Sequence, residues 1–125
     1  MSEDVPLLAV VDDDLDVRVA LTRLVSSAGF EVETYSSGAD FLRSIEDHAP
    51  DCLVLDLHMP EMSGFDVQAA LARDHARLPV IVITGHDTPE SRARAVALGA
   101  KHYLCKPVND DVLLDAIGVA IGGLA

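Results

Sequence analysis

Short apolar runs alternate with stretches of helical periodicity five times along the chain. A continuous apolar run of this length is typical of a strand that is buried on both faces of a sheet. The run at residues 7–11 is of this kind, and the pattern predicts further strands at residues 32–35, 52–55, 79–83 and 102–105. Because a helical pattern follows each run, we expect five strand–helix units in succession.

The helical segments carry recognisable start and stop signals. We expect helices over residues 15–28, around Phe41, Leu42 and Ile45, over 65–73, from Thr88–Pro89 to about Gly99, and over 112–121. Ser or Thr before a helix caps its free amides, and proline suits its first turn. Glycine commonly ends a helix, as we expect at Gly29 and at Gly122–Gly123.

Five strand–helix units with short connections predict an α/β fold, a doubly wound parallel sheet with helices on both faces. In such sheets, ligands bind beyond the carboxyl ends of the strands, near the point where the strand order reverses. Functional residues are therefore expected in the loops that follow the strands.

Composition narrows the class of protein. The chain has 125 residues, of which 50% are apolar and 4% aromatic, and a formal net charge of −12. We expect one domain over residues 1–125, with an aliphatic core. The negative charge disfavours direct binding of this domain to nucleic acid or to anionic membranes. The acidic start at residues 1–4 lacks the basic region of a signal peptide, so we expect a cytoplasmic protein.

Polar residues with reactive chemistry follow four of the expected strands. Asp12 and Asp13 follow the first, Asp56 the third, Thr84 the fourth and Lys106 the fifth. Carboxylates held close together repel one another, and Mg²⁺ relieves that repulsion while retaining several waters. A carboxylate is also a competent nucleophile toward phosphorus. Lys106 and Thr84 are suited to hold the oxygens of a transferred phosphoryl group.

This set of residues resembles that of bacterial two-component response regulator receiver domains. The resemblance extends to the surrounding sequence from Leu55 to Pro60, to Gly64 and to Lys106–Pro107, and it covers the chain from Leu7 to Ile121. The segment Ile83–His86 is most similar to the FixJ-like branch. The resemblance implies a CheY-like, flavodoxin-like five-stranded sheet in the order 2-1-3-4-5, with a cis bond between Lys106 and Pro107.

The resemblance also implies a role for each residue of the metal site. Asp56 is expected to accept the phosphoryl group. Asp13 and Asp56 are expected to bind Mg²⁺ through their carboxylates, and Asp12 through a bound water. The backbone carbonyl of His58 is expected to complete the protein ligands.

Further roles concern the switch and its partners. Lys106 is expected to pair with carboxylate or phosphoryl oxygens, and Thr84 to turn inward toward the phosphoryl group. Tyr103 lies where the family has a mobile aromatic side chain, although an aromatic in a short edge strand is equally typical of ordinary packing. The implied partners are a sensor histidine kinase or phosphotransfer protein, and a second copy of the chain after phosphorylation.

Several other polar residues have simpler interpretations. Asp14 is expected to be a charge at a helix start, where the helix dipole favours it. His58 and His86 are expected to be solvated loop side chains and not metal ligands. Cys52 and Cys105 lie in apolar runs without metal-ligand spacing, so we expect buried free thiols.

Three alternative functions are weaker. A haloacid-dehalogenase-type phosphatase also uses an aspartate nucleophile, but it needs a second aspartate where this chain has His58. A nucleotide-binding module needs a glycine-rich phosphate loop, and neither common motif is present. A receiver that binds without being phosphorylated is disfavoured by the complete set Asp56, Thr84 and Lys106. The output, either as a stand-alone regulator or as part of a transcription factor, stays open.

Overall fold

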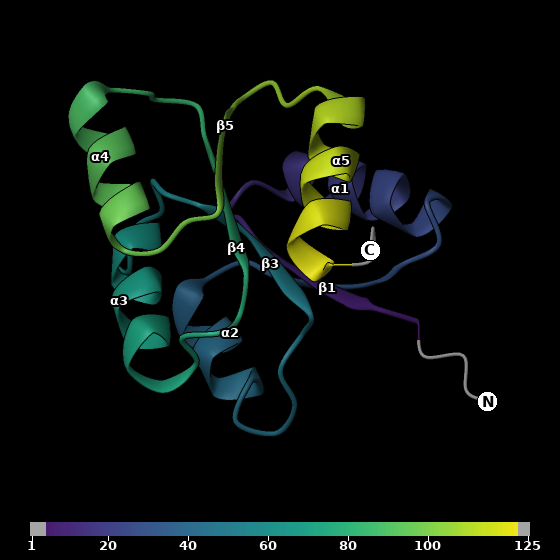
Figure 1. The fold of residues 1–125 in the computed structure, drawn as a ribbon, viewed down its shortest axis with the longest axis horizontal. Helices are drawn as coiled ribbons and strands as arrows, with labels where there is room; N and C mark the ends of the chain where they lie inside the picture. The colour runs from purple at the N-terminus through teal and green to yellow at the C-terminus, as the bar shows by residue number, and fades with distance from the viewer. Residues whose placement is uncertain (1–4, 123–125) are drawn as a thin grey trace.

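A parallel sheet of five strands forms the centre of the computed structural model, which describes residues 5–122 (Figure 1). The strand order is β2-β1-β3-β4-β5, as the family resemblance implies. The strands are β1 (Leu7–Val11), β2 (Glu31–Tyr35), β3 (Cys52–Asp56), β4 (Val80–Thr84) and β5 (His102–Cys105). Two expectations concern residues outside the described part of the chain, namely the acidic start at residues 1–4 and the helix end at Gly123.

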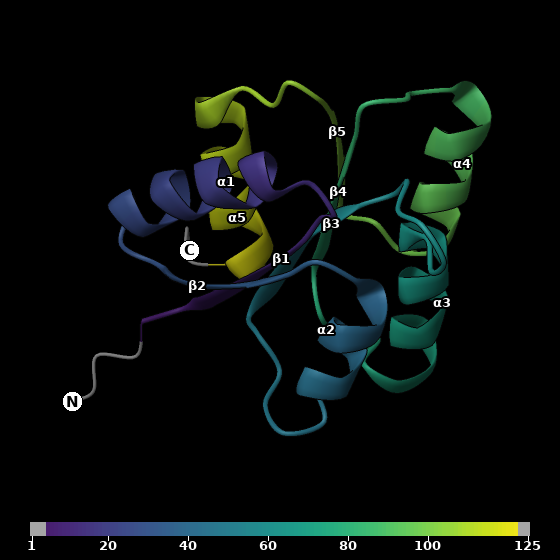
Figure 2. The ribbon, with the colours of Figure 1, turned by 180° about the vertical axis from the view of Figure 1, so that it is seen from behind.

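Five helices cover the two faces of the sheet. They are α1 (Leu15–Ser27), α2 (Gly38–Ser44), α3 (Gly64–Asp74), α4 (Pro89–Ala97) and α5 (Asp110–Ile121). Helices α1 and α5 lie on one face, and α2, α3 and α4 lie on the other (Figures 1 and 2). Between residues 5 and 122, none of the helices is both long enough and apolar enough to cross a membrane.

Alternate side chains of the central strands supply two separate cores. In β1, Leu8 and Val10 pack with the layer that contains α1 and α5. Ala9 and Val11 point to the opposite face and pack with the layer of α2, α3 and α4. All five residues of β3 and of β4 are buried. This two-sided burial explains why these strands are continuous apolar runs and do not alternate with polar residues.

Most of the expected boundaries are close to those observed, and the differences concern the ends of strands and helices. Strand β3 includes Asp56, and β4 runs from Val80 to Thr84, so both polar residues are the last residues of their strands. Pro79, which we expected in β4, precedes it, and its carbonyl accepts a hydrogen bond from Leu53 N at 2.9 Å. Helix α5 begins before Val112 because the Asn109 side chain caps it by accepting from Val112 N at 3.0 Å.

The expectation for the two cysteines is half right. Both are free thiols, but only Cys52 is buried, whereas Cys105 is exposed. Burial raises the pKa of the Cys52 thiol to about 12. Cys105 is the last residue of β5, which is an edge strand and therefore has one side without a neighbouring strand. An apolar run in an edge strand is thus a poor indicator of complete burial.

Gly64 allows the start of α3 to contact the end of β3. Its amide donates to Leu57 O at 2.9 Å. A Cβ at this position would lie 2.4 Å from Asp56 O and 2.8 Å from Leu57 Cα. Both are backbone atoms next to the polar end of β3, so a side chain at residue 64 would have to displace the backbone that positions Asp56.

We predict that Gly64→Ala lowers the stability of the fold by about 1–3 kcal/mol, because overpacking against backbone outweighs the entropy gained from alanine. Thermal melting without added metal measures this effect. Gly85→Ala is the matched control, since its Cβ would meet no heavy atom closer than Lys106 Cδ at 3.7 Å. Equal melting temperatures for the two variants would contradict the prediction.

Candidate functional site

The polar residues expected at the strand ends lie at one edge of the sheet. Asp12 follows β1, Asp56 ends β3, Thr84 ends β4 and Lys106 follows β5. The pairing of β1 with β3, of β3 with β4 and of β4 with β5 is parallel throughout. The carboxyl ends of these strands therefore meet (Figure 1). Strands β2 and β3 lie on opposite sides of β1, so this edge contains the reversal in strand order where ligands of such folds bind.

Three carboxylates form a cluster at this edge. Asp12, Asp13 and Asp56 each offer one oxygen, and these oxygens lie within 4.8 Å of one another. Asp12 is 0% exposed and Asp56 is 3% exposed, whereas Asp13 is open to solvent. Burial removes water that would otherwise screen the negative charges, so the cluster is costly unless a cation neutralises it.

Lys106 supplies one positive charge to the cluster. Its Nζ lies 2.9 Å from Asp12 Oδ2 and 3.4 Å from Asp56 Oδ1. Burial alone would lower the pKa of Lys106, but the two carboxylates more than offset this and raise it. Lys106 is therefore a fixed cation at the edge of the cluster. The Lys106–Pro107 peptide bond is cis, as the resemblance implies.

One lysine does not fully compensate the buried carboxylates. Burial and the charge of Asp12 raise the pKa of Asp56 to about 6, although Lys106 and the backbone amide of His58 act in the opposite direction. An ionised Asp56 is thus held in an unfavourable environment, and additional positive charge would stabilise it.

Asp12 has one oxygen that is suited to a cation. Its Oδ1 accepts a hydrogen bond from Asp14 N at 2.9 Å. Its Oδ2 is buried and has no hydrogen bond of good geometry. Lys106 lies close to Oδ2, but as an ionic contact without the direction of a hydrogen bond. A buried oxygen that contacts the Lys106 ammonium and lies beside two further carboxylates fits the oxygen-only ligand set that Mg²⁺ prefers.

Thr84 lies at the same edge but faces its own loop. It is 0% exposed, and its Oγ1 accepts a hydrogen bond from His86 N at 3.0 Å. Across residues 5–122, no hydrogen bond joins Thr84 to Asp56. Tyr103, on β5, donates its hydroxyl to Asp87 Oδ1 at 3.0 Å. Both expected switch residues are thus hydrogen-bonded to the β4–α4 loop.

His58 and His86 lie outside the carboxylate cluster, as expected for loop side chains. Both are exposed, but they are not independent. Their rings pack edge to face, with 5.6 Å between the centroids. The sequence analysis missed this pair because the two residues belong to different loops, and only the pairing of β3 with β4 brings them together.

Of two other contacts at the site, one was predicted from the sequence and one was not. Asp14 caps α1 by accepting from Asp16 N at 2.9 Å, which confirms its interpretation as a helix-start residue. Arg18, one turn along α1, donates to the carbonyl of Asp12 at 2.7 Å. Nothing in the sequence distinguished Arg18 from other charged residues on that helix.

Comparisons with known proteins agree with this geometry. The model of the response regulator receiver domain family matches residues 8–118. Response regulator protein TodT of Pseudomonas putida is 40% identical over 121 residues, covering 97% of this chain and 53% of TodT. The chain spans about half the length of the curated relatives it matches.

Solved structures give the same result. A response regulator receiver protein from Burkholderia phymatum is 41% identical, with a TM-score of 0.83 and coverage of 94% of this chain and 95% of that one. A CheY-like receiver domain protein from Methanospirillum hungatei has a TM-score of 0.91 with 96% of each chain covered; at 24% identity it shows the fold alone. Family model, relatives and fold together show that the chain belongs to the response regulator receiver domain family.

Proposed function

We propose that this chain is a phosphorylation-dependent switch of a two-component system that accepts a phosphoryl group on Asp56. The observation that carries the proposal is the position of Asp56, whose buried carboxylate lies beside Asp12, Asp13 and the Lys106 ammonium. The donor would be a sensor histidine kinase or a phosphotransfer protein. We further propose that residues 1–125 act as one receiver domain in the cytoplasm.

The proposed reaction is a direct transfer to the carboxylate. An oxygen of Asp56 forms a bond to phosphorus while the bond from phosphorus to the donor imidazole breaks. The imidazole nitrogen leaves with the electron pair and takes up a proton. Lys106, already 3.4 Å from Asp56 Oδ1, would hold a phosphoryl oxygen as negative charge spreads over the group.

Mg²⁺ would neutralise the carboxylates and the phosphoryl oxygens when it is bound. Asp13 and Asp56 would hold it through their carboxylates, Asp12 through water and His58 through its backbone carbonyl. The burial of Asp12 and the mutual proximity of the three carboxylates support this assignment.

The proposed signal passes through Thr84 and Tyr103. The Thr84 hydroxyl would turn toward the new phosphoryl group, and Tyr103 would follow into the space that Thr84 leaves. This movement would change the face formed by α4, β5 and α5. A second copy of the chain is the partner we propose for that face. The charge of −12 argues against direct contact of this domain with nucleic acid or membranes.

The phosphoacceptor can be tested with a small phosphodonor. Acetyl phosphate with Mg²⁺ is expected to give one phosphoryl adduct by mass spectrometry, because Asp56 ends β3 beside Lys106 and beside Asp12 and Asp13, the two carboxylates proposed to help hold the metal. The adduct should be absent in Asp56→Asn and present in Asp51→Asn, an exposed carboxylate at the opposite end of β3. An adduct that persists in Asp56→Asn would falsify the assignment.

Mg²⁺ should stabilise the folded chain, because a cation that binds only the native cluster adds stability by mass action, about 1.4 kcal/mol at tenfold excess over Kd. Thermal melting with increasing Mg²⁺ measures this. Asp13→Asn should reduce the stabilisation. Asp14→Asn is the matched control, because asparagine keeps the helix cap and removes only the neighbouring charge. A melting temperature independent of Mg²⁺ in the parent protein would refute the metal site.

The paired rings of His58 and His86 should prolong the phosphorylated state, because a packed pair next to Asp56 obstructs the approach of water to phosphorus. We expect His58→Ala and His86→Ala each to increase the decay rate severalfold in excess Mg²⁺. His75→Ala, at the far end of α3, should leave the rate unchanged. Equal rates in all four proteins would show that the pair has no such role, and slower decay would indicate that a ring positions the water instead.

A further inference from the structure

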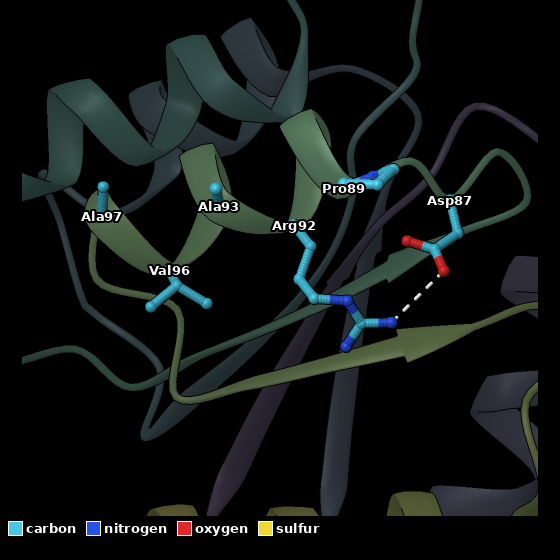
Figure 3. Close-up of a pocket in the computed structure, with 6 residues that line it drawn as sticks. All are labelled: Asp87, Pro89, Arg92, Ala93, Val96 and Ala97. Atoms are coloured by element: carbon cyan, nitrogen blue, oxygen red, sulfur yellow. Dashed lines mark hydrogen bonds and ion pairs between the residues drawn. The ribbon is translucent and has the colours of Figure 1, made fainter.

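Asp87, Arg92 and Tyr103 form a three-way contact that we call the loop clamp. The Asp87 carboxylate accepts from Tyr103 Oη at 3.0 Å and from an Arg92 guanidinium nitrogen at 3.2 Å. The Arg92 guanidinium also lies over the Tyr103 ring, 4.6 Å from its centroid. Figure 3 shows the Asp87–Arg92 pair at one end of a groove along α4. Each member of the clamp thus contacts the other two.

The three residues belong to different parts of the fold. Asp87 lies in the loop between β4 and α4, Arg92 lies on α4, and Tyr103 lies on the edge strand β5. The clamp therefore connects the loop to both of its neighbours. Mutual contacts of this kind support one another, since each side chain reduces the freedom of the other two.

The electrostatic effects of the clamp agree with its geometry. The hydrogen bond from Tyr103 is the largest cause of the lowered pKa of Asp87, and Arg92 lowers it further. The pKa of the Tyr103 hydroxyl is raised to about 12. Burial is the largest cause, and Asp87 acts in the same direction. Asp87 is thus an ionised acceptor and Tyr103 a neutral donor at neutral pH, and such a charge-assisted bond is stronger than one between neutral groups.

The clamp is one residue away from the contact that holds Thr84. The loop amide of His86 donates to Thr84 Oγ1 at 3.0 Å, and Asp87 is the next residue. The same short loop therefore fixes the Thr84 hydroxyl at one end and is fixed by Tyr103 and Arg92 at the other. If the Thr84 hydroxyl turns toward Asp56, its hydrogen bond with His86 N is lost, and a shift of the loop that follows would strain the clamp.

We propose that Asp87 and Arg92 are positioning residues that hold the β4–α4 loop and Tyr103 in the unphosphorylated arrangement and so oppose the inward movement of Thr84. This inference rests on the proposed function, because it assumes that Thr84 contacts a phosphoryl group on Asp56. Phosphorylation then has to break the clamp, and the strength of the clamp sets how readily the domain switches.

Arg94 provides a matched control on the same helix. It lies over the Phe65 ring, 4.2 Å from its centroid, and so makes the same type of contact as Arg92. Phe65 belongs to α3, however, and within residues 5–122 Arg94 makes no side-chain hydrogen bond or ion pair with the β4–α4 loop. Loss of Arg94 therefore tests the effect of removing an arginine–aromatic contact from α4 without releasing the loop.

The test is the affinity of the Mg²⁺-loaded protein for beryllofluoride, a stable analogue of a phosphoryl group on aspartate, measured by isothermal titration. Asp87→Ala and Arg92→Gln should each bind beryllofluoride about fivefold more tightly than the parent, the effect expected for loss of one partly exposed contact. Arg94→Gln should bind like the parent. Mg²⁺ affinity without beryllofluoride should be the same in all four proteins, because the clamp does not contact the carboxylate cluster.

A combined substitution tests whether the residues act as a unit. Asp87→Ala and Tyr103→Phe each remove the same hydrogen bond, so their effects on beryllofluoride affinity should not add. Unchanged or weaker affinity in Asp87→Ala and Arg92→Gln, or an equal gain in Arg94→Gln, would overturn the clamp while leaving the proposed function intact. A parent protein that binds no beryllofluoride would overturn both.

Discussion

Repulsion among buried carboxylates is the constraint on which the site depends. Asp12 and Asp56 are almost completely buried and lie beside Asp13, and Lys106 supplies one compensating charge. The raised pKa of Asp56, about 6, shows that the lysine does not compensate fully. This environment supports the proposal that the site binds a cation and that Asp56 accepts a phosphoryl group, since both would reduce the cost of the negative charge on Asp56. A site whose carboxylates were all paired with positive charges would attract an added cation less strongly.

The fold maintains that unfavourable arrangement with contacts that are individually ordinary. Strands β3 and β4 are buried along their whole length, so the residues at their ends have little freedom to move into solvent. Gly64 allows α3 to contact the backbone of Asp56, and Arg18 holds the carbonyl of Asp12. The two hydrophobic layers provide the stability that is lost at the polar edge, since burial of aliphatic side chains is the main favourable contribution to folding.

Sequence reasoning succeeded where a pattern is local and failed where it depends on contacts across the sheet. Short apolar runs that alternate with helical patterns located the five strands, and polar residues after them located the site, because parallel strands bring their ends together. The exposure of Cys105 was missed because its apolar neighbours indicated burial, although the implied strand order places its strand at the edge of the sheet. The His58–His86 pair and the Asp87–Arg92–Tyr103 clamp were also missed, because each joins side chains from separate elements and their residue types are unremarkable alone.

The distribution of contacts explains why Thr84, and not Lys106, is suited to report a change at Asp56. Lys106 already contacts Asp12 and Asp56, so it would have charged partners both before and after transfer. A contact present in both states contributes little to the free-energy difference between them. Thr84 is bonded to His86 N and not to Asp56, so a new bond from its hydroxyl would exist in one state only. The adjoining loop carries Asp87, so under the proposal a change in Thr84 would reach α4 through the chain and through Arg92, and β5 through the hydrogen bond from Tyr103.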